Sequence, residues 1–261
     1  MVGDRVLCSR IDDETLCIES VCTRTSALER LDRRGRSRIL ASNFDTMVIV
    51  AAPAPGIDRL IIDQYIVAAE SAGVTPVLLV NKIDLLSDAE IDALRGDLSC
   101  YARGGYTQLW CSAHNPDTLA PMFAALAKRT CVFVGPSGVG KSSLIQRIVP
   151  ARDIAVGELS RSGIGSHTTV AAYWYETDNG GAVIDSPGVR EFRVDHLPPT
   201  EIARGFRELS AASVECKFSD CSHRHEPDCA VKRALETGQI DPLRYANYVA
   251  LLTDSESVAR H

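Results

Sequence analysis

The feature that most restricts the fold of this chain is a glycine-rich segment at residues 135–142, GPSGVGKS. It matches the pattern GxxxxGK[ST], it follows the apolar run 131–134, and a helix is predicted directly after it over 143–148. In that order, a strand, a glycine loop and a helix N-terminus bring backbone N–H groups together around phosphate groups. The pattern therefore predicts an α/β fold with a phosphate-binding loop at the end of a buried strand.

The residues of this loop have expected roles in binding a nucleoside triphosphate. The Lys141 side chain reaches the β- and γ-phosphates, and the Ser142 hydroxyl binds Mg²⁺. The predicted nucleotide contacts in the loop and the first turn of the helix are Gly135, Pro136, Ser137, Gly138, Val139, Gly140, Lys141, Ser142 and Ser143.

A polar tetrapeptide, Asn81-Lys82-Ile83-Asp84, ends the predicted strand 76–80. The Asp84 carboxylate can accept hydrogen bonds from the ring N1–H and the exocyclic amine of guanine, a donor pair that adenine lacks. Asn81 can connect this loop to the phosphate loop, and the stem of Lys82 can cover the base. The carboxyl ends of strands are where open α/β sheets bind ligands, so GTP and GDP are the expected nucleotides.

A second base-binding loop is predicted at Ser112 and Ala113, after the strand 107–111, with backbone N–H groups directed at guanine O6. Both base-binding loops thus precede the phosphate loop in the chain, whereas conventional GTPases run in the opposite order. The sequence therefore predicts a circular permutation of the GTPase sheet, with its ends placed in what is normally a loop.

A further segment, DSPG at 185–188, closes the predicted strand 181–185. Asp185 is expected to hold Mg²⁺ through a water molecule, and the Gly188 N–H is expected to face the γ-phosphate. Between the two phosphate-contacting segments, Thr169 is the first choice for a hydroxyl on Mg²⁺, with Thr168 as the alternative.

The group that activates the attacking water is not evident from the motifs alone. Ras-like enzymes orient this water with a Gln just after the DxxG loop, but Val189 occupies that place here. His167 is the nearest polar candidate, although by position alone it fits a loop-stabilising histidine as well as a catalyst.

Near the C-terminus, three cysteines and a histidine fall within 14 residues: Cys216, Cys221, His223 and Cys229. A Cys₃His set closes a tetrahedral Zn²⁺ site with no position for water, so one structural zinc ion is predicted. His225 is an alternative to His223, because spacing does not distinguish them. The chain has nine cysteines, an odd number, and no recognisable export signal, so a full disulfide framework is not expected.

The composition narrows the possible partners. With a net charge of −6, the chain is not a general polycation, so nucleic-acid binding must come from local patches. The basic patch comprises Arg30, Arg33, Arg34, Arg36 and Arg38, which are RNA-contact candidates; its alternative interpretation is a solvated loop. No apolar run approaches the roughly 18 residues of a membrane span, so we expect a cytoplasmic protein without a membrane partner.

The alternation of predicted elements indicates a three-layer α/β sheet. Strands are expected at 5–9, 15–21, 39–42, 46–52, 76–80, 107–111, 131–134, 170–176 and 181–185. Helices are expected at 58–71, 88–101, 119–128, 143–148, 200–211 and 243–252. This divides the chain into an N-terminal β module over 1–44, the permuted GTPase domain over 45–195 and a helical zinc-binding domain over 196–261.

Together these features resemble one family, the circularly permuted GTPases of small-ribosomal-subunit assembly called RsgA or YjeQ. The resemblance rests on the order of the loops, on GSHTT at 165–169, on DSPGVREF at 185–192 and on the Cys/His spacing, and it spans residues 3–252. Its C-terminal part is carried by Ala230, Val231, Gly238, Ile240 and Tyr248.

The resemblance implies a GTP hydrolase, activated by the small (30S) subunit, that binds 16S rRNA in late maturation and is released on hydrolysis. It also implies an N-terminal OB-fold and a C-terminal zinc domain, both contacting rRNA, and a catalytic role for His167. The family's GDxV segment is matched by Gly3-Asp4-Arg5-Val6. Residues 1–44 are too few to close a five-stranded barrel, so a truncated OB-like module is expected. A monomer is expected.

Two other functions remain possible from the sequence. One is a nucleotide-gated RNA-binding scaffold with little turnover, and it would show no rise in hydrolysis with small subunits. The other is an ATPase or small-molecule kinase, and it would bind ATP more tightly than GTP.

Overall fold

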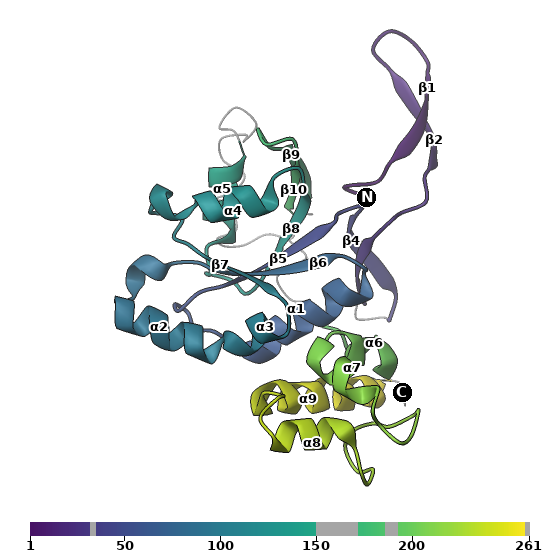
Figure 1. The fold of residues 1–261 in the computed structure, drawn as a ribbon. Helices are drawn as coiled ribbons and strands as arrows, with labels where there is room; N and C mark the ends of the chain where they lie inside the picture. Colours follow the sequence, from purple (N-terminus) through teal and green to yellow (C-terminus); the bar gives the residue numbers. More distant parts are fainter. Residues whose placement is uncertain (32–34, 150–171, 186–192, 259–261) are drawn as a thin grey trace.

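The computed structural model describes residues 1–31, 35–149, 172–185 and 193–258. Its centre is a six-stranded sheet in the order β7-β6-β5-β8-β10-β9 (Figure 1). Each neighbouring pair is parallel except β10 with β9, which is antiparallel. The strands are β5 (Thr46–Ala51), β6 (Thr75–Val80), β7 (Thr107–Trp110), β8 (Thr130–Val134), β9 (Tyr173–Glu176) and β10 (Ala182–Asp185).

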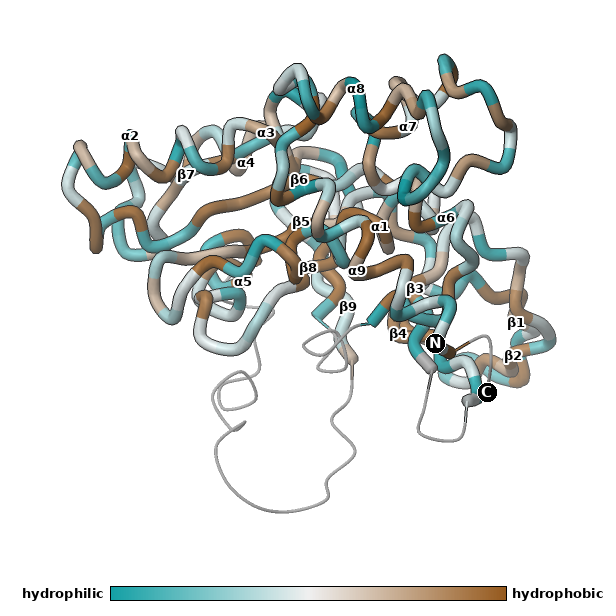
Figure 2. The backbone as a smooth tube through the Cα atoms, turned by 90° about the horizontal axis from the view of Figure 1, so that it is seen from below, coloured by the Kyte–Doolittle hydropathy of each residue, from teal (hydrophilic) through white to brown (hydrophobic). Residues whose placement is uncertain are grey.

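Alternate residues of the central strands supply two separate cores, one on each face of the sheet. Along β5, Met47 and Ile49 join the core formed with α1 (Arg59–Ser71) and α3 (Ser99–Arg103). Val48 and Val50 join the opposite core with α4 (Ala120–Leu126) and α5 (Lys141–Ile148). Figure 2 shows these central strands as predominantly hydrophobic. A strand buried on both faces reads as a continuous apolar run, which is why the sequence predicted these strands well.

The predicted helix over 88–101 is wrong as one element. It is divided at Leu98 into α2 (Asp88–Asp97) and α3, because Leu98 leaves helical geometry at φ −94° and ψ 2°. Short 3₁₀ turns follow the two base-binding strands, at η1 (Ile83–Leu85) and η2 (Pro116–Thr118).

The N-terminal part consists of two antiparallel hairpins and not of a closed barrel. β1 (Val6–Arg10) pairs with β2 (Leu16–Val21), and β3 (Ala27–Leu31) pairs with β4 (Ser37–Ser42). The first hairpin projects away from the sheet (Figure 1) and carries exposed apolar side chains, among them Leu7 and Ile18. The second is anchored through Leu28 and Leu40 in the core. β3 was not among the predicted strands.

The C-terminal part consists of four helices: α6 (Pro199–Arg204), α7 (Arg207–Ser213), α8 (Ala230–Glu236) and α9 (Pro242–Val258). The single helix predicted over 200–211 is wrong, since the chain leaves helical geometry at Phe206, and α8 was missed. A Cβ at Gly205 would lie 2.3 Å from Val67 Cγ2, so the end of α6 packs directly against α1. Phe206 and Leu252 share one core with Ile66 of α1, so these helices do not build a separate core.

Candidate functional site

The predicted nucleotide-binding loops meet at one edge of the sheet. β6, β5, β8 and β10 run parallel as neighbours, so their carboxyl ends lie together. Asn81 follows β6, Gly135 follows β8, and Asp185 is the last residue of β10. The loops that are distant in sequence order are therefore adjacent in space, as the permuted order predicts.

Two glycines of the phosphate loop lie where no other residue fits. Gly135 has a φ of +136°, and a Cβ there would lie 2.3 Å from the carbonyl oxygen of Val50. Gly140 has a φ of +94°, and its Cβ would lie 2.3 Å from Asn81 Nδ2. The loop can approach β5 and the base-binding loop this closely because it lacks side chains at these points.

Asn81 joins the three loops of the site. Its side chain is buried, and its Nδ2 donates to the carbonyl oxygen of Val139 at 2.9 Å. Its Oδ1 accepts a hydrogen bond from the Ala113 N–H at 3.1 Å. The expected link between base-binding loop and phosphate loop is therefore present. The Ala113 N–H already has Asn81 as acceptor, so its predicted contact with guanine O6 stays a prediction.

The two lysines of the site lie against backbone carbonyls. Lys82 has left-handed backbone geometry (φ 63°), and its Nζ donates to the carbonyl oxygens of Ala54 at 3.0 Å and Gly138 at 2.6 Å. Lys141 Nζ donates to Gly135 and Pro136, both at 2.6 Å. The Lys82 stem thus spans from the base-binding loop to the phosphate loop, which is the position needed to cover a base.

A cleft of about 400 Å³ lies between these loops. The residues that line it are Lys82, His114, Ser137, Gly138, Gly140, Lys141, Ser142 and Ser143. His114 was missed by the sequence analysis, although its place directly after Ala113 was a usable signal. Arg147 was missed as well: its Nε donates to the carbonyl oxygen of Ala113 at 2.9 Å, and no motif marks it.

Several predicted site residues lie outside the described residues: His167, Thr168, Thr169, Gly188 and Val189. Of the predicted magnesium ligands, Ser142 and Asp185 are described. They stand at the start of α5 and at the end of β10, on the same edge of the sheet.

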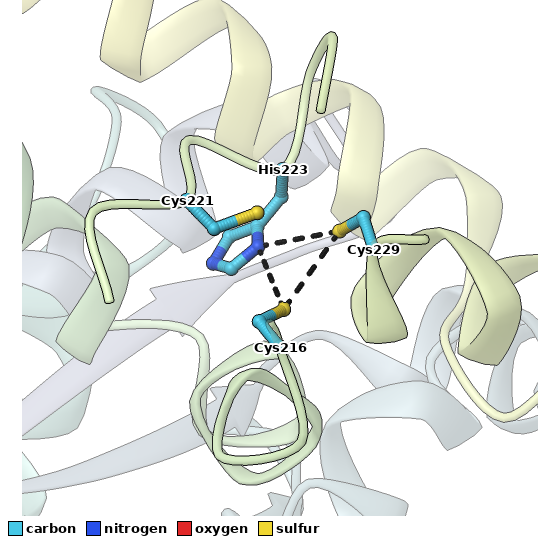
Figure 3. A group of neighbouring side chains, drawn as sticks. All are labelled: Cys216, Cys221, His223 and Cys229. Carbon is cyan, nitrogen blue, oxygen red and sulfur yellow. Dashed lines mark hydrogen bonds between the residues drawn. The ribbon is translucent and has the colours of Figure 1, made fainter. Parts of the chain in front are cut away.

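The four predicted metal ligands converge in the C-terminal part (Figure 3). Their ligand atoms all lie within 4.8 Å of one another. His223 Nδ1 is 3.6 Å from Cys216 Sγ and 3.5 Å from Cys229 Sγ, and these two sulfurs are 3.9 Å apart. His223 and not His225 belongs to this group, which decides the alternative left open by the spacing. The cluster can hold a metal ion.

The surroundings shift the pKa values of three of the ligands, favouring the metal-binding form of Cys216 and His223 but not that of Cys221. Burial opposes the charge of the Cys216 thiolate, but the backbone of Ala230 and Val231 hydrogen-bonds to it, and the pKa of the Cys216 thiol falls below its usual range. Burial lowers the pKa of His223 and thus favours its neutral ring. Burial raises the pKa of Cys221 to about 12, so this thiol needs a cation beside it to ionise.

The ligand loop is organised by Glu226. Its carboxylate accepts hydrogen bonds from the N–H and hydroxyl of Ser222 at 2.8 and 2.7 Å, and from the N–H groups of Arg224 and His225 at 3.1 Å each. The Tyr245 hydroxyl donates to the His223 carbonyl oxygen at 2.7 Å. These contacts hold the loop around the ligands.

The described arginines of the predicted basic patch lie on or beside the strands of the second hairpin. Arg30 of β3 and Arg38 of β4 are cross-strand partners, and Arg36 directly precedes β4. Arg36 and Arg38 are exposed and Arg30 is half-buried, while Arg33 and Arg34 lie outside the described residues. Arg30 and Arg38 therefore lie on strands and not in a loop, and the predicted RNA contacts of the patch stay a prediction.

Comparisons with known proteins agree with this geometry. The sequence profile described as RsgA GTPase matches residues 21–195. A protein of Vibrio vulnificus named small ribosomal subunit biogenesis GTPase RsgA 1 is 44% identical over 245 residues, covering 94% of this chain and 69% of that protein. A protein of Haemophilus influenzae named small ribosomal subunit biogenesis GTPase RsgA is 39% identical over 257 residues, covering 97% and 74%.

Two solved structures share the fold. YjeQ from Thermotoga maritima has a TM-score of 0.77 at 29% identity, covering 97% of this chain and 83% of that one. YloQ, described as a circularly permuted GTPase, has a TM-score of 0.77 at 28% identity, covering 97% and 80%. The permuted sheet, its adjoining loops and these relatives lead to one conclusion: the chain belongs to the RsgA GTPase family.

Proposed function

We propose that this protein hydrolyses GTP during late maturation of the small (30S) ribosomal subunit, binds 16S rRNA there and is released on hydrolysis. The relatives' names supply the subunit. The observation that carries the nucleotide part is the Asn81 side chain, which bonds both the phosphate loop and the second base-binding loop. One asparagine thereby sets the distance between the proposed base and phosphate sites.

The proposed nucleotide contacts follow from the edge of the sheet. Asp84 selects guanine, Lys141 neutralises the β- and γ-phosphates, and the Gly188 N–H faces the γ-phosphate. Mg²⁺ would be held by Ser142, Thr169 and Asp185, and it supplies charge neutralisation on the transferring phosphoryl group. Ser142 lies in the first turn of α5, which follows β8, and Asp185 ends the neighbouring parallel strand β10, which fits a shared cation.

We assign activation of the attacking water to His167. His167→Ala is expected to leave GTP binding within about twofold and to lower turnover by about 10²-fold or more, the usual contribution of one general base. The exposed His225→Ala serves as the matched histidine control. Unchanged turnover in His167→Ala would remove the assignment.

The metal in the Cys₃His cluster is proposed to be structural Zn²⁺. With Zn–S near 2.3 Å and Zn–N near 2.0 Å, a tetrahedral site separates two sulfurs by about 3.8 Å and a sulfur from a nitrogen by about 3.5 Å. The observed separations are 3.9 Å between Cys216 and Cys229 and 3.5–3.6 Å from these sulfurs to His223. Zinc would link the loop to α8, because Cys229 directly precedes that helix.

The rRNA contacts are assigned to the basic patch, Arg30, Arg33, Arg34, Arg36 and Arg38. Phosphate contacts by these side chains would make subunit binding weaken steeply with salt. We further propose a cytoplasmic monomer with the three-part division 1–44, 45–195 and 196–261. None of the helices in the described part of the chain combines the length and apolar character needed to cross a bilayer.

The test is GTP turnover with and without purified small subunits. A steep rise with subunits is expected for an assembly GTPase. No rise would favour the scaffold with little turnover, and tighter binding of ATP than of GTP would contradict the guanine site altogether. Asp84→Ala provides the control, because it should lose guanine-nucleotide binding while keeping the fold.

A further inference from the structure

The second base-binding loop is held from two sides at a single residue, Ala113. Its N–H donates to Asn81 Oδ1, and its carbonyl oxygen accepts a hydrogen bond from Arg147 Nε at 2.9 Å. Ala113 is buried, and the next residue, His114, lines the cleft. The position of the Ala113 backbone therefore determines where this wall of the cleft lies.

Arg147 is connected to the phosphate loop through a single helix. It lies on α5, which begins at Lys141, and the N-cap residue of that helix is Gly140. A continuous path thus runs from Val139 through Asn81 and Ala113 to Arg147, and back along α5 to the loop. Asn81 makes the hydrogen bonds on one side of this closed path, and Arg147 makes the hydrogen bond on the other side.

We propose that Arg147 is a positioning residue for the base-binding loop, so that its hydrogen bond to Ala113 contributes to guanine-nucleotide affinity. The proposal rests on the guanine site proposed above. Arg147 is not among the described residues that line the cleft, so it acts through the backbone of residues 112–114. If the loop is released on the Arg147 side, base binding weakens while the phosphate loop keeps its geometry.

The structure allows a sharp choice of variants. Arg147 is exposed, so its replacement does not disturb the core. Arg147→Met keeps an unbranched side chain as far as the position of Arg Nε and removes the donor together with the rest of the guanidinium. Arg147→Gln restores an N–H donor at the same number of bonds from Cα as Arg Nε, without the charge. Gln146→Met, on the exposed neighbouring position of α5, is the control for a general effect on the helix.

The experiment measures dissociation constants of GDP, ADP and inorganic triphosphate on the full chain. In Arg147→Met, GDP binding is expected to weaken about 3- to 10-fold, the effect of one hydrogen bond. Triphosphate binding should be unchanged, and Arg147→Gln should bind GDP within about twofold of the wild type. Gln146→Met should match the wild type for all three ligands.

Three results would overturn the proposal. GDP binding of Arg147→Met equal to the wild type would show that the hydrogen bond does not matter. Equal weakening of GDP and triphosphate, or an Arg147→Gln variant as weak as Arg147→Met, would indicate a different cause. A wild-type protein that binds ADP as tightly as GDP would instead remove the guanine site itself, and with it the proposed function.

Discussion

Replacing Arg244 with methionine should strongly destabilise the protein, because this arginine is a buried cation between α9 and α1. Its side chain has no exposed surface. Its Nη1 donates to Asp63 Oδ1 at 2.5 Å, and its Nε and Nη2 donate to the Glu208 carboxylate at 2.7 and 3.0 Å. The guanidinium also lies 4.5 Å from the ring centroid of Phe206.

The predicted loss of folding stability comes from the charged group that the substitution leaves without a charged partner in the core. The Asp63 side chain is also without exposed surface and would keep the Asn247 amide, at 2.6 Å, but lose its cation. Removing one partner of a buried ion pair costs about 3–5 kcal/mol, because the remaining charge is uncompensated. For a chain of this size, that lowers Tm by roughly 6–20 °C. The exposed pair of Arg95 and Asp92, 3.5 Å apart, should contribute less than about 1 kcal/mol.

The assay is urea and thermal unfolding of metal-loaded protein, with Arg95→Met as the control. Burial raises the pKa of Asp63 and the Arg244 guanidinium opposes that rise, so once Arg244 is removed a neutral side chain fits this position better than a carboxylate. Adding Asp63→Asn to Arg244→Met should therefore recover part of the lost stability. If Arg244→Met costs no more than Arg95→Met, or if Asp63→Asn makes the double variant worse, the reasoning about an uncompensated buried charge is wrong.

Three further predictions concern other parts of the chain. Asp84→Asn should weaken GDP binding by about 10²-fold or more and favour xanthosine diphosphate, whose 2-carbonyl oxygen can accept a hydrogen bond from the new amide. Unchanged GDP binding in a competition assay would contradict this prediction. Removing the metal with a chelator, or replacing Cys229 with serine, should first raise the rate of amide hydrogen exchange in residues 216–236, while α9 stays protected by its packing on α1. If residues 216–236 and α9 lose their protection at the same time, this prediction is wrong. Hydrogen bonds from Arg24 hold the pKa of Asp4 well below its usual range, so Asp4→Asn should lower the free energy of unfolding of the protein at pH 7. The difference in unfolding free energy between wild type and variant should shrink as the pH falls below about 4. A difference in urea unfolding that does not change with pH would contradict this prediction.

The sequence by itself determined the nucleotide edge of the fold and the three cysteines of the metal cluster. Glycine loops, apolar runs and closely spaced cysteines are local patterns, and the geometry they require is set within a few residues. The phosphate loop needs glycines at Gly135 and Gly140 because the backbone has positive φ angles at both positions. The order of the loops also determined the permuted sheet, since parallel strands place their carboxyl ends at one edge.

Only the tertiary structure decided which groups complete these sites. Arg147 contacts a carbonyl oxygen 34 residues away, and Arg244 contacts Asp63 across 181 residues. It also showed that the C-terminal helices share a core with α1, that Arg30 and Arg38 are cross-strand partners on β3 and β4, and that His223 and not His225 joins the metal ligands. Such pairings depend on which residues packing brings together in three dimensions. A contact with a backbone carbonyl also leaves no pattern in the sequence, because every residue type has this group.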